Sequence, residues 1–396
     1  MDRGDRAIRL AICTDTFTPQ VNGVARTLDR LTDAVRARGG EVRVWTPRDP
    51  GASPRPDVSP LPSTSFWAYP ELRLTLARWE PVARDILDWQ PTVVHAATPF
   101  GAGLAGRHVA LSRGIPLVTS YHTNFSAYAR FYRLGWLASP GWRFLRWFHN
   151  SGRRTYAPSG ATAGELRARG FRRVKVWSRG VDTTRFAPSY RSDELRAQLG
   201  ALDGRILVGY VGRMAREKGL ETLLGAMHEL DRELPGRFVF AFAGDGPYLA
   251  TMRRASPASA RFLGRLEGEA LSRFHASLDL FTFPSTTDTF GNVLLEAMAS
   301  GVPVLAAESG PSRDILADGR GVLYHPGSAL NLARALHVAT AQPARLGAMR
   351  TASLAYARRH GWARIFDDLM DDYRMVITEA RTEVTLAGRR VVLAGI

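Results

Sequence analysis

Short β-rich runs alternate with helical patterns from one end of this chain to the other. A first series of candidate strands lies at residues 7–15, 41–47, 91–98, 115–122 and 172–180. A second series lies at residues 205–213, 238–244, 260–266, 278–285, 301–307 and 321–327. Repeated βα units build parallel sheets that are covered by helices on both faces. The pattern predicts an α/β protein with two doubly wound, Rossmann-like domains facing each other across a cleft, with functional residues at the carboxyl ends of the strands.

The linker between the two series gives the domain boundary. A chain of 396 residues is long enough for two domains. The stretch TTRFAPSYRSDELRAQLG separates the two series and leads into a helix. We therefore place the boundary between residues 184 and 185. Residues 47–62 are rich in proline and are expected to form an exposed loop.

The cysteine content and the hydropathy of the sequence indicate the cellular compartment of the protein. Cys13 is the only cysteine, which excludes an intramolecular disulfide and favours a reducing compartment. The charged N-terminus precedes an apolar stretch that is too short for a signal peptide, and glycine and proline interrupt the longer apolar runs. We expect a cytoplasmic protein, either free in solution or peripheral at the inner face of the cytoplasmic membrane.

The formal net charge of +16 points to an anionic partner, either nucleic acid or a membrane surface. Lys175 and Lys218 are the only lysines, so the many arginines reflect a compositional bias and each carries little information. No acidic residue occurs between Asp88 and Glu165. Within that segment, residues 129–154 alternate arginine with aromatic side chains, as an interfacial membrane anchor does. A pair of core helices with a solvated basic face is the alternative.

One familiar pattern is better explained by packing. Residues 101–106, GAGLAG, match the dinucleotide-binding pattern G-x-G-x-x-G after a strand. A dinucleotide site also needs an acid about twenty residues further on, and none occurs before Glu165. Small residues that let a helix approach the sheet closely explain the match, and NAD is not expected.

Two cations precede a predicted helix in the second series. Arg213 ends a strand, and Lys218 comes just before a helix that begins near Gly219. Cations at a helix N-terminus suit a diphosphate, because the unpaired N–H groups and the helix dipole also favour anions. Taken alone, Arg213 could equally be an ordinary surface cation. Because lysine is rare in this chain, the presence of Lys218 nearby favours a functional role for both residues.

The first series has candidates of its own at the ends of strands. Asn22 and Gly23 follow the first strand and open a helix, where glycine lets a ligand approach the backbone and presents bare N–H groups. An ordinary strand-to-helix turn is the alternative. His122 follows the fourth strand of the series, and this position favours a functional role over a structural one.

The stretch DTFGNVLLEAMASGVPV, residues 288–304, places Asp288 at the end of a strand and Glu296 two turns into the next helix. Together with FTPQVNGVARTL, GRMAREKGLETLL, FAGDGP and FLGRL, it resembles the family-4 retaining glycosyltransferases of the GT-B fold, over nearly the whole chain. It corresponds to the E-x7-E signature of that family, with Asp288 where the first Glu is usual. YHTNFSAYARFYRLGWL further resembles the glycolipid subgroup, which includes mannosyl- and sulfoquinovosyltransferases that use diacylglycerol-type acceptors.

The resemblance implies a division of labour between domains. Residues 1–184 would bind the acceptor and residues 185–360 the nucleotide sugar. Residues 361–396 would contain a helix that crosses back to the first domain, with one apolar face formed by Trp362, Phe366, Leu369, Tyr373 and Val376. The aspartates of this helix are interpreted as a solvated acidic face. A short hairpin and a disordered extension are both open for residues 383–396.

The resemblance also implies roles for the donor-binding residues. Glu296 would accept hydrogen bonds from the ribose hydroxyls, and Asp288 would hold hydroxyls of the donor sugar. The backbone at Phe290, Gly291 and Asn292 would contact the distal phosphate.

Further roles concern the reacting centre and the base pocket. Arg213 and Lys218 would neutralise the departing nucleoside diphosphate, and His122 would lie near the reacting centre. Gly23 would admit the donor phosphates or the acceptor close to the backbone. Gly244 and Leu266 would line the base pocket.

The chemistry expected is metal-independent transfer of a hexose from GDP-mannose or a UDP-hexose to a lipid or glycan acceptor, without a cofactor. No carboxylate nucleophile can be assigned, which favours a front-face mechanism with the leaving phosphate as base. A nucleotide-sugar epimerase or a phosphorylase of the same fold is an alternative, and a phosphorylase would need Lys175 or Lys218 for pyridoxal. A basic nucleic-acid-binding protein is a third alternative. However, the sequence contains no zinc-finger, RNP or helix-turn-helix signature, so no nucleic-acid partner is expected.

Overall fold

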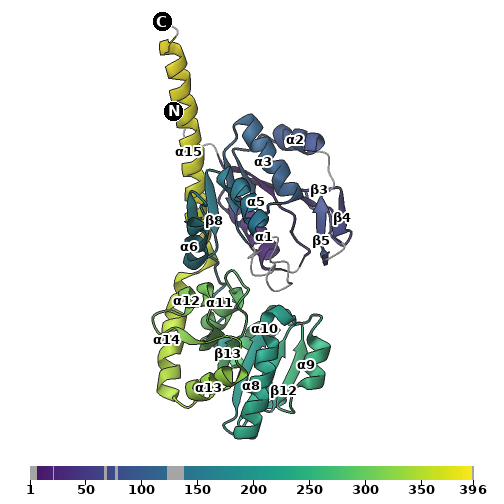
Figure 1. Ribbon diagram of the computed structural model, residues 1–396, viewed down its shortest axis with the longest axis vertical. Helices are drawn as coiled ribbons and strands as arrows, with labels where there is room; N and C mark the ends of the chain where they lie inside the picture. Colours follow the sequence, from purple (N-terminus) through teal and green to yellow (C-terminus); the bar gives the residue numbers. More distant parts are fainter. Residues whose placement is uncertain (1–6, 21, 67–68, 76–78, 123–137, 395–396) are drawn as a thin grey trace. The chain divides into compact units, whose positions relative to one another are not determined.

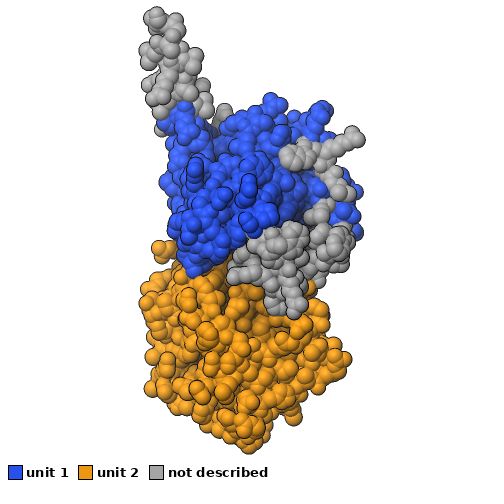
Figure 2. All heavy atoms as spheres, in the orientation of Figure 1, with its two compact units in different colours: residues 1–123, 134–178, 365–396 blue, residues 124–133, 179–364 orange. Residues whose placement is uncertain are grey.

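The computed structural model describes residues 7–20, 22–66, 69–75, 79–122 and 138–394 (Figure 1). The chain divides into two compact units (Figure 2). Unit 1 consists of residues 1–123, 134–178 and 365–396, and unit 2 of residues 124–133 and 179–364. The longer segment of unit 2 runs from residue 179 to residue 364. The backbone accounts for this, because Val181 donates its N–H to the carbonyl of His360 at 2.9 Å and ties the two ends of unit 2 together.

Unit 1 contains a parallel sheet of seven strands in the order β3-β2-β1-β6-β7-β8-β9. These strands are β1 (Arg9–Cys13), β2 (Glu41–Pro47), β3 (Val58–Leu61), β6 (Val93–Ala96), β7 (Leu117–Ser120), β8 (Arg154–Ala157) and β9 (Val174–Val176). A separate antiparallel pair consists of β4 (Ser63–Phe66) and β5 (Tyr69–Thr75). The helices are α1 (Gly23–Ala37), α2 (Trp79–Asp88), α3 (Gly101–Arg113), α5 (Ala138–Asn150), α6 (Gly160–Ala168) and α15 (Trp362–Ala394). The predicted doubly wound sheet is confirmed here.

Two strands of this sheet lie where none was expected. β3 occupies the end of the proline-rich segment 47–62, which is therefore not simply an exposed loop. It forms the edge of the sheet, where Pro60 can be tolerated because an edge strand needs fewer backbone donors. β8 consists of only four residues and begins with an arginine, so its apolar pattern is weak.

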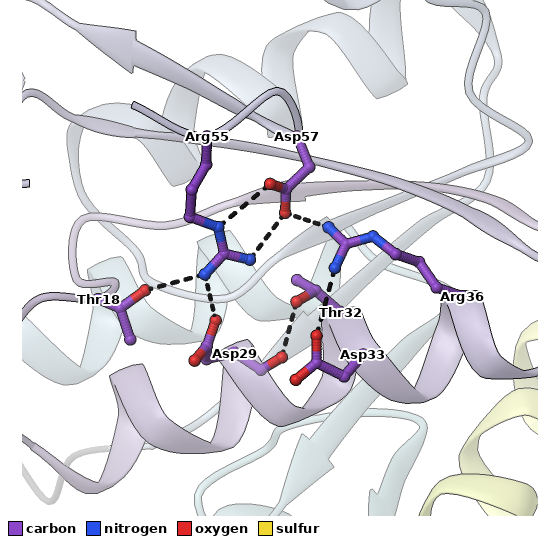
Figure 3. Close-up of polar contacts among 7 residues, drawn as sticks. All are labelled: Thr18, Asp29, Thr32, Asp33, Arg36, Arg55 and Asp57. Carbon is purple, nitrogen blue, oxygen red and sulfur yellow. Dashed lines mark hydrogen bonds and ion pairs between the residues drawn. The ribbon is translucent and has the colours of Figure 1, made fainter. Parts of the chain in front are cut away.

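Ion pairs fasten the segment before β3 to α1 (Figure 3). The Arg55 guanidinium donates to Asp29 Oδ1 on α1 at 2.6 Å and to both carboxylate oxygens of Asp57 at 2.9 and 3.1 Å. Arg36 on α1 also pairs with Asp57. A weaker contact of 3.4 Å joins Arg55 to Thr18 in the loop after β1. The segment is therefore held against the helix whose N-terminus follows that loop.

The glycines of residues 101–106 serve close packing, as interpreted from the sequence. A Cβ atom on Gly103 would lie 1.6 Å from the carbonyl oxygen of Thr98, and one on Gly106 would lie 2.4 Å from the Cys13 sulfur on β1. The helix α3 can lie against the sheet only because these positions carry no side chain.

The final helix α15 belongs to unit 1 from residue 365 onward, which confirms the predicted return to the first domain. Phe366, Leu369, Tyr373 and Val376 are buried, as the apolar face required. Two expectations were wrong. The helix is continuous to Ala394, so residues 383–394 form neither a hairpin nor a disordered extension. The acidic face is not all solvated, because Asp372 is buried.

Unit 2 contains a parallel sheet of six strands in the order β12-β11-β10-β13-β14-β15. The strands are β10 (Ile206–Val211), β11 (Phe238–Ala243), β12 (Ala260–Gly264), β13 (Leu280–Phe283), β14 (Val304–Ala307) and β15 (Gly321–Tyr324). The helices are α7 (Asp193–Leu199), α8 (Leu220–Glu233), α9 (Leu249–Ala255), α10 (Gly268–Ser277), α11 (Asn292–Ala299), α12 (Gly310–Leu316), α13 (Ala329–Thr340) and α14 (Pro343–Arg359).

The central strand β11 shows why its sequence is continuously apolar. All six residues are buried. Val239, Ala241 and Ala243 belong to one hydrophobic cluster, whereas the three phenylalanines between and before them belong to another. Successive side chains of a strand point to opposite faces, so each face of the sheet carries its own core. This confirms the doubly wound arrangement predicted for the second series.

Candidate functional site

The loop between β13 and α11 brings Asp288 against Lys218. Lys218 ends a 3-10 turn (Arg216–Lys218) after β10, and its Nζ atom donates to Asp288 Oδ1 at 2.7 Å. The two loops are in direct contact, because a Cβ atom on Gly219 would lie 2.3 Å from the carbonyl oxygen of Pro284. Two residues singled out separately in the sequence thus form one ion pair, which the sequence did not predict.

The second oxygen of this carboxylate has no partner in the described structure. Asp288 Oδ2 is buried and makes no hydrogen bond with any described residue. Buried polar atoms are usually hydrogen-bonded, and an exception calls for a ligand or water. Asp288 can therefore accept one further hydrogen bond while Lys218 holds its other oxygen.

The N-terminus of α11 lies next to this carboxylate in the chain and is uncapped. Gly291 adopts a left-handed conformation with φ of 87°, and no side chain among the described residues caps the helix. No acidic residue lies in the first turn, which begins at Asn292. Phe290 is buried and fixes the turn in the core. The backbone donors of this turn suit an anion such as a phosphate.

Three further loops at the same edge are locked together by backbone hydrogen bonds. Gly212 donates to the carbonyl of Ala243 at 3.0 Å, and Gly244 donates to the carbonyl of Gly264 at 2.7 Å. A Cβ atom on Gly244 would lie 1.9 Å from the Gly212 carbonyl oxygen. The loops after β10, β11 and β12 therefore form one surface of backbone groups. Leu266, which follows β12, packs against the core beside them.

Arg213 lies half-buried in the loop after β10. The hydroxyl of Tyr210 donates to the Arg213 carbonyl at 3.0 Å. Burial, with the nearby charges of Asp288 and Glu217, raises the pKa of Tyr210 far above its ordinary value. The phenol therefore keeps its proton and holds the backbone that carries Arg213.

Glu296 lies on α11 with its side chain 20% exposed, and sequence reasoning missed its neighbour. His275 Nε2, on α10, lies 3.5 Å from Glu296 Oε2. The His275 ring is fully buried against Phe186 and Phe281. Neither ring nitrogen makes a hydrogen bond with a described residue, so the 3.5 Å contact with Glu296 is not a hydrogen bond. No local pattern marks His275, because its partner lies on another helix.

The two candidate site residues of unit 1, His122 and Gly23, lie in different surroundings. His122 is buried just after β7, and its Nε2 atom lies 2.7 Å from Ser120 Oγ. Gly23 is exposed at the start of α1. The expectation of bare N–H groups there is wrong for Val24 and Ala25, because the Asn22 side chain accepts from both, at 3.0 and 2.9 Å. This capping is what an ordinary N-terminal turn shows.

The basic and aromatic segment falls only partly within the described structure. Residues 129–137 lie outside the described residues, and α5 covers much of the rest. Its Leu145 and Phe148 are buried, whereas Trp147 is 51% exposed. The Arg107 guanidinium lies 3.8 Å from the centre of the Trp147 ring. One face of α5 thus serves the core and the other presents aromatic and basic groups.

Neither a metal-binding cluster nor a membrane-spanning helix occurs among the described residues. No group of three or more His, Cys, Asp or Glu among the described residues could hold a metal ion. No helix of the described structure is both long and apolar enough to cross a membrane.

Comparison with known proteins assigns the family. Residues 21–185 match the model for Glycosyltransferase Family 4, and residues 191–354 match the model for Glycosyl transferases group 1. The chain belongs to the family-4 glycosyltransferases. The family resemblance stated from the sequence motifs is confirmed, and the protein is an enzyme of the glycosyltransferase class.

Relatives of this glycosyltransferase extend over most of its length. A GDP-mannose-dependent alpha-mannosyltransferase of Mycolicibacterium smegmatis is 35% identical over 380 residues, which cover 93% of this chain and 98% of the relative. A sulfoquinovosyl transferase of Arabidopsis thaliana is 33% identical, with coverages of 78% and 61%. An alpha-monoglucosyldiacylglycerol synthase of Streptococcus pneumoniae is 27% identical, with coverages of 80% and 75%.

Solved structures agree on the fold. A sucrose-phosphate synthase of Thermosynechococcus elongatus superposes with a TM-score of 0.76 over 94% of this chain and 100% of its own, at 19% identity. The HepE protein of Anabaena, solved with UDP and glucose, superposes with a TM-score of 0.73 over 92% and 99%, at 20% identity. These likenesses confirm the predicted GT-B architecture.

Proposed function

We propose that this glycosyltransferase transfers mannose from GDP-mannose to a lipid acceptor with retention of configuration. The observation that carries the proposal is the Lys218–Asp288 pair, in which one carboxylate oxygen is held at 2.7 Å and the other is buried without a partner among the described residues. That oxygen suits a sugar hydroxyl, which would donate the missing hydrogen bond. Mannose is favoured over other hexoses because the relative matched over 98% of its length is named for GDP-mannose.

The diphosphate of the donor would be held by charge and by backbone donors. The phosphate nearest the sugar would meet the N-terminus of α11 at Gly291 and Asn292, where no described side chain competes. Lys218 and Arg213 would stabilise the charge that develops as the diphosphate leaves. Protein cations in this role make a metal unnecessary, so we infer a metal-independent reaction without a cofactor.

The remaining donor contacts follow from the same geometry. Glu296 would accept hydrogen bonds from the ribose hydroxyls, and the neighbouring His275 would hold its carboxylate in place. Gly244 and Leu266 would border the base. The loops around Gly244 offer mainly backbone groups, which can bind either a purine or a pyrimidine. The donor panel described below identifies the base.

The transfer exchanges one bond at the anomeric carbon of the sugar for another. The bond between the anomeric carbon and the distal phosphate oxygen breaks, and that oxygen keeps the electron pair. An acceptor hydroxyl oxygen forms a new bond to the same face of the anomeric carbon. Its proton passes to the departing phosphate, so no carboxylate nucleophile is needed. His122 would contact the sugar near this centre, and Gly23 would lie beside the donor or acceptor.

The acceptor would be reached at a membrane surface. Exposed Trp147, with Arg107 over its ring, gives α5 an aromatic and basic face, and such faces bind at the interface of anionic bilayers. One relative is named as an alpha-monoglucosyldiacylglycerol synthase, whose name contains a lipid. We infer a cytoplasmic enzyme that is peripheral to the membrane. Its positive charge would bind anionic lipids and not nucleic acid.

A donor panel tests the proposal. GDP-mannose, UDP-glucose, UDP-galactose and UDP-sulfoquinovose are added in turn, and the melting temperature and the slow release of nucleoside diphosphate are recorded. We expect GDP-mannose to raise the melting temperature, and we expect Glu296→Ala to lose that shift while the unliganded protein melts as before. Stabilisation by a UDP-sugar alone would overturn the choice of donor, and no response to any of them would overturn the donor site.

A further inference from the structure

A line of buried hydrogen bonds connects α15 with His122 inside unit 1. The Tyr373 hydroxyl, on α15, lies 2.7 Å from His95 Nδ1 on β6. His95 Nε2 lies 2.9 Å from Ser120 Oγ at the end of β7. The same Ser120 oxygen lies 2.7 Å from His122 Nε2. Tyr373 and His95 are fully buried and Ser120 is 1% exposed, so water does not break the line.

The direction of these hydrogen bonds is fixed at the tyrosine end. Among the described residues, His95 Nδ1 is the one hydrogen-bond partner of the Tyr373 hydroxyl. Burial and the charge of Asp372 raise the pKa of Tyr373 well above its ordinary value, so the phenol keeps its proton. A buried hydroxyl hydrogen needs an acceptor. Tyr373 must therefore donate, and His95 Nδ1 must accept with its lone pair.

The remaining protons follow by elimination. Because His95 Nδ1 accepts, the ring hydrogen sits on Nε2 and is donated to Ser120 Oγ. A doubly protonated His95 is excluded, since it would leave the phenol hydrogen without an acceptor. The serine hydroxyl has one hydrogen, and with its oxygen already accepting from His95 it donates to His122 Nε2. The hydrogen of neutral His122 is then on Nδ1.

We propose that Tyr373, through His95 and Ser120, fixes His122 in the Nδ1–H form, so that His122 acts as a hydrogen-bond donor and not as a base. A protonated ring nitrogen can only donate, and the other nitrogen is occupied by serine. The position of the proton follows from the hydrogen bonds inside unit 1. Its meaning for the sugar rests on the proposed function, which places His122 near the reacting centre. Tyr373, His95 and Ser120 are positioning residues.

A charged group next to Tyr373 holds α15 in the register that the line requires. Asp372 Oδ1 accepts from Lys175 Nζ at 2.8 Å and lies 3.5 Å from Arg154 Nε. Its Oδ2 atom accepts from the Tyr156 hydroxyl at 2.8 Å. These contacts reach strands β8 and β9, so they secure the helix at the turn that carries Tyr373. They also explain why Lys175, one of only two lysines, lies here rather than in a pyridoxal site.

Nitrogen NMR on the full-length protein labelled with ¹⁵N-histidine tests the tautomer. At a pH where the ring is neutral, we expect the signal assigned to His122 to show a protonated Nδ1 and an unprotonated Nε2. Tyr373→Phe removes the donor that sets the direction, so a mixture of tautomers is expected. Tyr324→Phe removes a buried hydroxyl in unit 2, outside the line, and should leave the His122 signal unchanged.

Clear outcomes would overturn the proposal. A wild-type His122 with its hydrogen on Nε2 would reverse the direction of the line. An unchanged tautomer in Tyr373→Phe would show that Tyr373 does not set it. If Tyr373→Phe does not fold, Ser120→Ala breaks the same line in the middle and should give the same mixture, and an unchanged tautomer there would contradict us equally.

Substitution of His122 itself tests whether the side chain acts as a hydrogen-bond donor in the reaction, independently of its tautomer. Asparagine places a donor near the position of Nδ1, whereas aspartate of the same size can only accept. We expect His122→Asn to release nucleoside diphosphate from GDP-mannose at least about tenfold faster than His122→Asp. Equal rates, with the tautomer as predicted, would leave the hydrogen-bond line standing and refute the role of His122 at the sugar. Lack of response to any donor, by contrast, would refute the proposed function and not the line.

Discussion

Asp288 is the residue at which this chain departs from the signature that it otherwise resembles. An aspartate carboxylate lies about 1.5 Å closer to its backbone than a glutamate carboxylate would. In the structure this shorter side chain still reaches Lys218, with Nζ and Oδ1 2.7 Å apart. The loop and the lysine together thus place the carboxylate, and its second oxygen stays available for a sugar hydroxyl.

Substitution of Asp288 tests that role. Asp288→Ala should lower kcat by about a hundredfold, because it removes both the hydroxyl contact and the carboxylate that Lys218 Nζ contacts. Asp288→Glu should keep activity, because it restores the residue usual in this family and the flexible lysine can follow. The measurement is nucleoside diphosphate release at saturating donor. Full activity in Asp288→Ala would refute the sugar-holding role.

Gly244 tests whether the donor loops depend on backbone contact. Gly244→Ala would place a Cβ atom 1.9 Å from the Gly212 carbonyl oxygen, and the loops would have to separate. We expect a loss of about 3 kcal/mol in the free energy of unfolding, together with loss of donor binding. Gly236→Ala is the matched control, since Gly236 also has a positive φ but nothing lies within 4 Å. It should cost about 1 kcal/mol and keep donor binding.

The residues differ in how visible they are in the sequence. Lys218 stood out because lysine is rare here, and Asp288 and Glu296 stood out because they share one strand–loop–helix unit. His275 could not be found, because its contact with Glu296 joins two helices. The line to His122 joins residues 95, 120 and 373, and nothing local relates such positions. Short-range chemistry was predictable, and partners brought together by the fold were not.

At the scale of elements, α15 is the helix whose sequence was least well interpreted. Its apolar face was predicted, because the spacing of Phe366, Leu369 and Tyr373 repeats within the helix. The burial of Asp372 was not, because it depends on Lys175 and Tyr156 in strands far away in the chain. β8 and β3 were missed for a similar reason, since short strands are stabilised by their neighbours in the sheet.

The adjacent aspartates of α15 give a matched test. Asp372→Ala removes the acceptor of the buried Tyr156 hydroxyl and the carboxylate that pairs with Lys175, and should lower the free energy of unfolding by about 3 kcal/mol. Asp371→Ala removes a side chain that is 69% exposed and should change stability little. Chemical denaturation of both variants measures the difference. Equal effects would show that Asp372 does not anchor the helix.

At the scale of the whole molecule, the net charge of +16 calls for a partner. We expect the protein to bind vesicles that contain phosphatidylglycerol and to dissociate as salt is raised. Trp147→Ala should weaken this binding severalfold, because the ring would insert at the interface. Leu330→Ala is the control, since Leu330 is equally 51% exposed but lies on α13 of unit 2. Equal weakening by both variants in vesicle flotation would argue against α5 as the membrane face.

The most direct test of the account is transfer itself. GDP-mannose is incubated with the protein and vesicles that contain diacylglycerol-type lipids, and the lipid product is isolated for NMR of the new linkage. We predict a mannolipid with the α configuration of the donor. It should form when a chelator is present, and it should not form with the Glu296→Ala variant. A β-linked product would contradict retention, and donor binding without transfer to any lipid would contradict the proposed acceptor class.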